Sequence, residues 1–408
     1  MTLALPALHP QSAGHVLLKP GFVLDRQSID RLTELGVHGL WIRYPGLEAV
    51  MRFISPEVLA EHARLTRLLG SGLDRITRDA AAPLAFQPYA RAVRALVRKL
   101  GDEPTCQMLV ADVVRADNRI VTHSSNVCFL SLTMGLKLEN YLVLQRRKLS
   151  QADARNVENL GVGALLHDIG VLGLDQEVRE RYLNTGDEQD RAWQAHVKLG
   201  YDRVRHSVEP TAAVAVLQHH QRFDGRGYPA IPVRGGRARP LRGEEIHIFA
   251  RIIAVAELFD RMRCPLSNAV EAAPAVRALR RLADEARGGA IDPIVFKALL
   301  AVAPPYPPGT LVTLNDGFPA VVVGYDPARP CRPIVQEVLC PMSRIDPTDL
   351  PLGRVIDLKL APGLHVAEIG PYEVERDNFE PVEPGEFDLR VLTPPKPAAK
   401  PARRRRAA

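Results

Sequence analysis

The sequence predicts a multidomain protein in which a large all-helical core lies between a small N-terminal α/β module and a small C-terminal β domain. Apolar residues recur with helical spacing from about Pro83 to Val302. A proline-rich run at 304–308 ends that pattern, and beyond it short apolar runs with strand-like alternation take over. The expected parts are residues 1–82, 83–303, 304–392 and a basic tail at 393–408.

The first 82 residues combine strand and helix signals. Branched and aromatic residues predict strands at 15–18 and 40–44. Apolar residues with helical spacing predict a helix at 25–35, with Ser28 as its cap, and a longer helix at 56–79. His62 on this longer helix is interpreted as a packed histidine and not as a ligand.

The central and C-terminal parts differ in the spacing of their apolar residues. The central helices are expected at residues 88–100, 103–116, 123–138, 150–168, 188–206, 209–221, 243–262, 269–287 and 292–301. The C-terminal strands are expected at 311–314, 320–323, 334–335, 354–360 and 387–392, with Asn315-Asp316-Gly317 as a hairpin signal. This domain has no cluster of metal-ligand residues in its sequence, so a supporting or interaction role is its default.

Charge and composition exclude several protein classes. The net charge is +6, and the tail from Thr393 to Ala408 carries six positive charges and no acid. The body is therefore formally neutral, which argues against binding to a nucleic acid polymer, and the tail is expected to be disordered. No apolar segment approaches a membrane span, no signal peptide is evident, and the five cysteines form no CxxC pair. We therefore expect a cytoplasmic protein.

Histidines and carboxylates suggest chemistry in the helical part. His167 and Asp168 stand side by side at the end of an apolar run, and His219 and His220 are adjacent before a glycine-rich loop. Glu257 lies within an apolar helix, where an unpaired carboxylate costs several kcal/mol. Each feature alone has an ordinary explanation, such as helix capping, a surface position or pairing of Glu257 with Arg251 or Arg261.

Taken together these residues fit a metal centre. Seven imidazole and carboxylate ligands are more than one ion usually takes from a protein, and they suit Mn, Fe or Zn. Two such ions roughly 3.5–4 Å apart lower the pKa of a shared water and hold phosphoryl oxygens. The residues therefore predict phosphoester hydrolysis through a hydroxide activated by a binuclear metal centre.

Segment 83–302 resembles the HD-GYP domain, a subgroup of the HD phosphohydrolase superfamily. The resemblance rests on ordered motifs and covers a little over half of the chain. These motifs are His123-Ser124, Leu165-Leu166-His167-Asp168-Ile169-Gly170, His196-x-x-x-Gly200, the run from His219 to Pro229, and the run from Ala250 to Asp260. The resemblance implies an all-helical domain that binds two or three metal ions and hydrolyses the bacterial second messenger cyclic di-GMP to pGpG or GMP.

The resemblance also implies roles for individual residues. The expected metal ligands are His123, His167, Asp168, His196, His219, His220 and Glu257. Asp168 is expected to bridge the ions and, with His167, to be catalytic. Gly227, Tyr228 and Pro229 are expected to shape the substrate pocket, and Asp224 is expected to orient a ligand imidazole.

The chain departs from the family at several positions. Glu257 and Gln221 stand where aspartate and glutamate are usual, and Val171 replaces a lysine placed near substrate phosphate. The arginine-rich stretch that the family has after the Glu257 helix is shortened here and has a different sequence. Arg119 stands where members with three metals have glutamate, so two ions are expected, with Fe or Mn preferred over Zn.

Three functions follow as expectations. The first is a metal-dependent cyclic di-GMP phosphodiesterase. The second is a catalytically weak or inactive module that binds metals and nucleotide and signals through its flanking domains, which Val171 and the altered arginine-rich stretch favour. The third is a phosphohydrolase for another cyclic dinucleotide or phosphoester. Homodimerisation and a signalling partner are left open.

Overall fold

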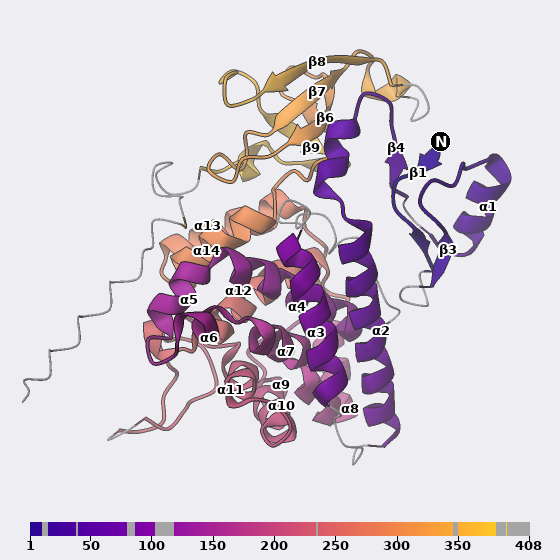
Figure 1. The fold of residues 1–408 in the computed structure, drawn as a ribbon. Coiled ribbons are helices and arrows are strands. Elements are labelled where there is room, and N and C mark those ends of the chain that lie inside the picture. Colours follow the sequence, from indigo (N-terminus) through magenta and orange to yellow (C-terminus); the bar gives the residue numbers. More distant parts are fainter. Residues whose placement is uncertain are drawn as a thin grey trace, which may run out of the picture.

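The computed structural model confirms the predicted class: a helical core with a small N-terminal part and a C-terminal antiparallel sheet (Figure 1). It describes residues 1–9, 15–37, 40–79, 86–102, 118–233, 236–345, 350–380 and 389. The predicted helix at 103–116 and the basic tail lie outside these residues, as does the strand at 387–392 apart from residue 389. The proposed domain boundaries stay predictions.

The N-terminal part pairs short strands and adds one helix. Its elements are β1 (Thr2–Leu3), β2 (Ala7–Leu8), β3 (Val16–Leu18), α1 (Arg26–Glu34), β4 (Ile42–Arg43) and the 3-10 helix η1 (Glu48–Phe53). β1 pairs with β4 and β2 with β3. The expectation that Ser28 caps the helix is wrong, because the Asp25 carboxylate caps it and accepts from the Ser28 amide at 2.7 Å.

The central part consists of α-helices and short 3-10 helices. They are α2 (Pro56–Arg78), α3 (Phe86–Asp102), α4 (Arg119–Lys137), α5 (Glu139–Gln145), α6 (Gln151–Arg155), α7 (Glu158–Leu166), η4 (Ile169–Gly173), α8 (Gln176–Thr185), α9 (Arg191–Gln194), α10 (His196–Val204), α11 (Pro210–Gln218), η5 (Gly243–Glu245), α12 (Ile248–Arg263), α13 (Ala275–Arg287) and α14 (Pro293–Val302). The predicted helix at 150–168 is broken near Asn156, whose side chain accepts from the Glu158 amide and starts α7. The helix predicted at 188–206 divides into α9 and α10, and sequence periodicity missed α5 and α8.

Helix α4 lies at the centre of this part. Its residues are buried from Val121 to Gly135, and it packs against α7, α12, α14 and α2. Small residues make the close packing possible. A Cβ atom on Gly161 of α7 would lie only 2.8 Å from the Leu132 side chain of α4. Helices α4 and α7, which position His123, His167 and Asp168, are thereby packed closely together.

A buried ion pair joins α12 to α14. The Arg251 guanidinium lies 2.7 Å from the Asp292 carboxylate, and the Tyr141 hydroxyl donates to Asp292 at 2.9 Å. Arg251 also donates to the Tyr141 oxygen. Arg251 is therefore not the partner of Glu257, one of the two pairings that the sequence suggested.

The C-terminal strands form one antiparallel sheet in the order β10-β9-β5-β6-β7-β8. Its elements are β5 (Leu311–Leu314), β6 (Pro319–Gly324), β7 (Ile334–Val338), η6 (Met342–Arg344), β8 (Leu352–Asp357), β9 (Val366–Ile369), β10 (Tyr372–Glu373) and η7 (Glu375–Asp377). The predicted hairpin is confirmed: β5 pairs with β6 across a turn in which Gly317 has a φ of 87°. The sheet lies beside α13 (Figure 1). Arg277 of α13 meets Asp377 of η7, the 3-10 helix that follows β10, at 2.9 Å.

Among the described residues, no single helix has the length and apolar composition to cross a membrane. Two bent helix pairs meet that criterion together by length and composition: α4 with α5, bent by 85°, and Gln151–Gly173 with α8, bent by 115°.

His62 is the packed histidine that the sequence predicts. It is fully buried, its Nε2 lies 3.1 Å from the Ser125 carbonyl oxygen, and its ring packs on Phe129. Burial lowers the pKa of His62 from 6.5 to about 4, although the bond to Ser125 opposes the shift. Between pH 6.5 and 4, His62 therefore binds a proton in the unfolded chain but not in the folded chain.

Stability linked to His62 is consequently present above pH 6.5 and lost as the pH falls toward 4. We expect the wild type to lose roughly 2 kcal/mol more than His62→Leu between pH 6.5 and 5. Chemical unfolding of both proteins at the two pH values measures this difference. The exposed His206→Leu serves as control, and equal acid sensitivity of wild type and His62→Leu would contradict the assignment.

Candidate metal centre

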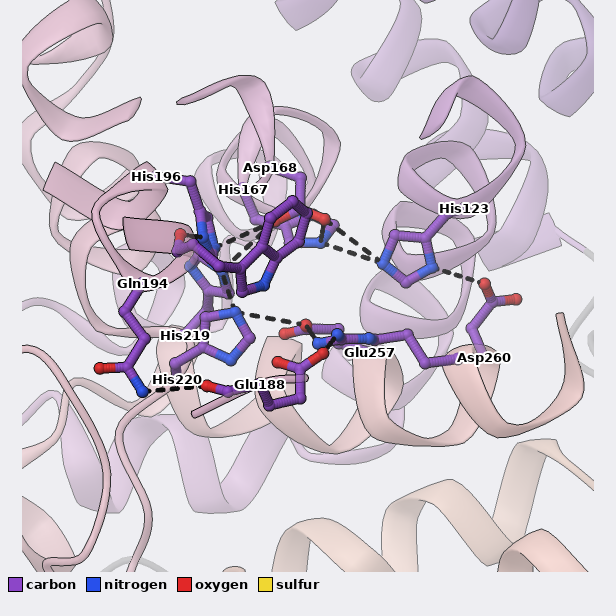
Figure 2. Close-up of polar contacts among 12 residues, drawn as sticks. His123, His167, Asp168, Glu188, Gln194, His196, His219, His220, Glu257 and Asp260 are labelled. Carbon is purple, nitrogen blue, oxygen red and sulfur yellow. Dashed lines mark hydrogen bonds and ion pairs between the residues drawn. The ribbon is translucent and has the colours of Figure 1, made fainter. Parts of the chain in front are cut away.

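All seven predicted ligands lie within the described residues and meet in one place (Figure 2). They come from five of the helices and from the turns that follow two of these. His123 lies on α4, His167 and Asp168 end α7, His196 begins α10, His219 and His220 follow α11, and Glu257 lies on α12. Six of them are buried, and His220 is partly exposed. Two groups of these ligand atoms are each compact enough to hold an ion: Asp168, His196, His219, His220; and His123, His167, Glu257.

Asp168 lies between the imidazoles with one oxygen toward each side. Its Oδ2 is 3.7 Å from His123 Nε2 and 3.4 Å from His167 Nε2. Its Oδ1 is 3.4 Å from His196 Nε2 and 3.7 Å from His219 Nε2. A carboxylate in this position can contribute one oxygen to each of two ions.

Three of the imidazoles are held by the helix ends from which they project. Each ring places Nδ1 2.7 Å from the carbonyl oxygen three residues earlier: His167 on Ala164, His196 on Trp193 and His219 on Val216. The last carbonyls of a helix lack partners within the helix, so they are available as acceptors. Because a carbonyl only accepts, the proton of each neutral ring lies on Nδ1, and Nε2 presents a lone pair to the centre of the site.

The fourth imidazole is held by a carboxylate. His123 Nδ1 donates to Asp260 Oδ2 at 2.7 Å, and the Asn126 amide donates to Asp260 Oδ1 at 3.0 Å. Asp260 thereby fixes His123 with Nε2 inward. Sequence reasoning missed Asp260, although a usable signal existed: it lies three residues after Glu257, on the same face of an apolar helix.

The structure places the Asp224 carboxylate against its own loop, and its hydrogen bonds and ion pairs within the described residues include no ligand imidazole. Its Oδ1 accepts from the Arg226 amide at 2.9 Å, and its carboxylate lies 3.6 Å from the guanidinium groups of Arg222 and Arg226. These contacts shape the loop itself. Asp260 is the carboxylate that orients a ligand imidazole, that of His123.

The charge pattern of this centre fits divalent cations. The Nε2 atoms of His123 and His167 are 3.3 Å apart, and both lack a proton when the rings are neutral. Within the described part of the chain, Asp168 Oδ1 and His219 Nε2 are buried without a hydrogen-bond partner. Acceptors that converge without donors are costly in a protein interior unless a cation lies between them. Neutral imidazole and carboxylate are suitable ligands for Fe, Mn and Zn.

Burial keeps three of these imidazoles in the neutral form that a metal requires, whereas burial, with Asp168 and Asp260 adding, raises the pKa of Glu257 well above its usual value. Burial lowers the pKa of His219 to about 4, and it lowers the pKa of His196 and, to a greater extent, of His220. Burial alone would raise the pKa of Asp168, but His167, His219 and His196 outweigh it and hold that pKa well below its usual value. Neutral rings beside an ionised carboxylate can bind a metal at neutral pH.

Two glycines set the distance between η4 and α10. A Cβ atom on Gly170 would lie 1.9 Å from the His196 carbonyl oxygen and 2.4 Å from the Gly200 amide nitrogen. Only a residue without a side chain permits this approach of two backbones. The approach brings His196 next to Asp168, which explains why Gly170 and Gly200 accompany the two ligand motifs.

A cavity of about 630 Å³ opens beside the imidazole cluster. Gly227 and Tyr228 line it, as expected, whereas Pro229 does not. The Tyr228 ring stacks on His220 with centroids 4.6 Å apart, and its amide donates to the His220 carbonyl at 3.1 Å. A Cβ atom on Gly227 would lie 2.4 Å from the same carbonyl oxygen, so glycine is required for the loop to pack here.

Gln221 connects this loop to the chain beyond it. Its Nε2 donates to the Pro229 carbonyl at 2.6 Å, and its Oε1 accepts from the Leu241 amide at 2.8 Å. An ionised glutamate could accept but could not donate. The amide at position 221 is therefore part of how this chain holds the loop.

The structure also shows where two other residues lie at which the chain departs from the family, Val171 and Arg119. Val171 is 3% exposed, packs with Tyr182, Trp193 and Leu266, and does not line the cavity. Arg119 donates to the Leu266 carbonyl and to Asn268, away from the ligands.

Comparisons with known proteins agree with this geometry. A family model described as HD domain matches residues 134–295, a range that contains every predicted ligand except His123. The chain is 27% identical over 337 residues to "Cyclic di-GMP phosphodiesterase PA4108" of Pseudomonas aeruginosa, covering 74% of each protein. It is 31% identical over 161 residues to "3'3'-cGAMP-specific phosphodiesterase 3" of Vibrio cholerae, covering 39% of the chain and 32% of that protein.

A "Cyclic di-GMP phosphodiesterase" of Thermotoga maritima is 31% identical over 149 residues, which cover 35% of the chain and 37% of that protein. Thus the match spans about three quarters of the Pseudomonas protein and about a third of the other two. The solved structure "Bd1817, a HDG"Y"P protein from Bdellovibrio bacteriovorus" aligns with a TM-score of 0.44 at 14% identity, over 73% of this chain and 97% of that one.

Proposed function

We propose, because this chain belongs to the HD-GYP family of HD-domain proteins, that it is a divalent-metal-dependent phosphodiesterase that hydrolyses cyclic di-GMP to pGpG and GMP. The observation that carries the proposal is the position of Asp168 between two sets of inward-facing imidazole nitrogens. The names of the Pseudomonas and Thermotoga relatives support this substrate.

We assign one ion to each of the two compact ligand groups. His123, His167 and Glu257 would hold one ion, and His196, His219 and His220 the other, with Asp168 contributing an oxygen to each. We propose Fe or Mn as these ions, and Zn is also compatible with the donor set. When bound, two such ions would supply positive charge for phosphoryl oxygens and lower the pKa of a water molecule.

The residues of the chain position the substrate and exclude water. The cavity of about 630 Å³ is within the range usual for small-molecule sites. Burial, with Glu257, Asp168 and Tyr182 adding, raises the pKa of Tyr228 well above its usual value, so its hydroxyl keeps its proton. That hydroxyl is buried without a partner among the described residues and can donate to a substrate oxygen or a base.

A second candidate is hydrolysis of a related cyclic dinucleotide. The Vibrio relative named for 3'3'-cGAMP is 31% identical over 161 residues, which equals the identity of the Thermotoga relative named for cyclic di-GMP over 149 residues. Both substrates present the same cyclic phosphodiester and differ in one base. Discrimination between these two substrates therefore depends on the residues of the cavity wall and not on the metal ligands.

The test is a substrate panel on protein purified under reducing conditions with Mn or Fe. Cyclic di-GMP, 3'3'-cGAMP and pGpG are assayed on one preparation whose metal content is measured. We expect cyclic di-GMP to be hydrolysed most efficiently, at about two metal ions per chain. Binding of cyclic di-GMP without turnover would replace the proposal with a sensor function, and faster turnover of 3'3'-cGAMP would change the substrate.

A further inference from the structure

Arg261 occupies a special place in the cavity. It lies one helical turn after Glu257 on α12, and its Nη1 donates to Glu257 Oε1 at 2.8 Å. Its side chain is 14% exposed and lines the cavity beside the imidazole cluster. Its positive charge therefore lies in the wall of this cavity, in contact with one proposed metal ligand.

A carboxylate covers the other edge of this guanidinium. Arg261 Nη2 contacts the Glu188 carboxylate and the Tyr182 hydroxyl, and that hydroxyl donates to Glu188 Oε1 at 2.6 Å. Gln194 donates to the Glu188 carbonyl at 2.9 Å and so holds the turn between α8 and α9 (Figure 2). Glu188 is 35% exposed and lines the same cavity, so solvent reaches it from the side on which substrate would enter.

The other cations on the described cavity wall are less suited to bind phosphate near the metals. Arg222 is 39% exposed and lies 3.2 Å from Glu285. Arg226 is 82% exposed, and Arg281 is also exposed. Val171, at the position where a lysine was expected, is buried in an apolar cluster outside the cavity. Of these cations, Arg261 is the least exposed and the one in contact with a proposed metal ligand.

We propose that Arg261 binds a phosphate of the substrate, and that Glu188 is an internal carboxylate that occupies this position until the substrate displaces it. The inference rests on the proposed function. A guanidinium forms the same paired hydrogen bonds with a carboxylate as with a phosphate, so one group can replace the other. The partial exposure of Glu188 lets it leave without breaking the core.

Opposite effects of two substitutions test this assignment. In metal-loaded protein we expect Arg261→Gln to raise the KM for cyclic di-GMP about 10-fold or more, because a hydrogen bond from a charged donor is lost. We expect Glu188→Gln to lower KM by about 2- to 5-fold, because a partly exposed ion pair no longer competes. Arg261→Lys, which keeps the charge but not the paired geometry, should fall between wild type and Arg261→Gln.

Asp187→Asn is the matched control, since it removes the same charge from the same turn. Asp187 accepts from the Gln189 amide, and its carboxylate does not line the cavity. Its KM should stay within about twofold of wild type. The metal content of every variant is measured in parallel, and it should not change.

The outcomes separate this inference from the proposed function. If wild type hydrolyses cyclic di-GMP but Glu188→Gln leaves KM unchanged, Glu188 does not compete and the inference is wrong. If Arg261→Gln loses metal without a separate effect on KM, Arg261 only positions Glu257, and the inference is again wrong. If metal-loaded wild type neither binds nor hydrolyses cyclic di-GMP, the proposed function fails and the inference fails with it.

Discussion

Asp168→Ala is expected to remove metal binding and phosphodiesterase activity together. The two oxygens of Asp168 face different pairs of imidazole nitrogens, so its loss affects both proposed ion positions at once. A metal centre contributes several kcal/mol of transition-state stabilisation, and 4 kcal/mol corresponds to roughly 1,000-fold in rate. We therefore expect activity to fall by about 1,000-fold or more, and elemental analysis to show less than one ion per chain.

Asp175→Ala is the control for this experiment. Asp175 lies seven residues further along the chain, is exposed, and takes no part in the ligand cluster. Its removal should leave both metal content and rate unchanged. Circular dichroism of Asp168→Ala should retain the helical signal, because the helices are held by apolar packing around α4. A fully active Asp168→Ala protein with two ions would refute the proposed ligand set.

The ligands could be predicted from the sequence because their order and spacing follow local rules. His167 and His219 each end a helix, where a backbone carbonyl is free to accept a hydrogen bond from the ring Nδ1. His196 follows the short helix α9 and bonds to a carbonyl of that helix in the same way. A short motif can therefore specify both the residue and its tautomer. The helical core was predictable for a similar reason, since periodicity identifies a helix before its partners are known.

Features that depend on distant contacts could not be predicted in this way. Asp260 reaches His123 across 137 positions of sequence, whereas Asp224, next to the ligand motif, bonds within its own loop. Glu188 belongs to a turn with no motif, and only folding brings it to Arg261. Local signals placed the ligands, but the residues that orient them and compete for the cavity depend on how α8, α9 and α12 pack.

Gly170→Ala is the second substitution with a large expected effect. The new Cβ would lie 1.9 Å from the His196 carbonyl oxygen and 2.4 Å from the Gly200 nitrogen. Both neighbours are backbone atoms, so no rotamer change can relieve the clash, and η4 and α10 must separate. Overpacking of this kind costs about 3 kcal/mol or more when the backbone has to move. Separation also moves His196 away from Asp168, so metal content should fall along with stability.

Gly173→Ala is the matched control, because it adds the same methyl group to the same 3-10 helix. There the Cβ would meet only the Leu199 side chain, at 3.6 Å, which is an ordinary contact. We expect Gly173→Ala to unfold within about 1 kcal/mol of wild type and to retain its metal ions. Chemical unfolding and elemental analysis of both variants make the comparison. If Gly170→Ala matched Gly173→Ala in both measurements, close backbone contact would not be what positions His196, and the required glycine would need another cause.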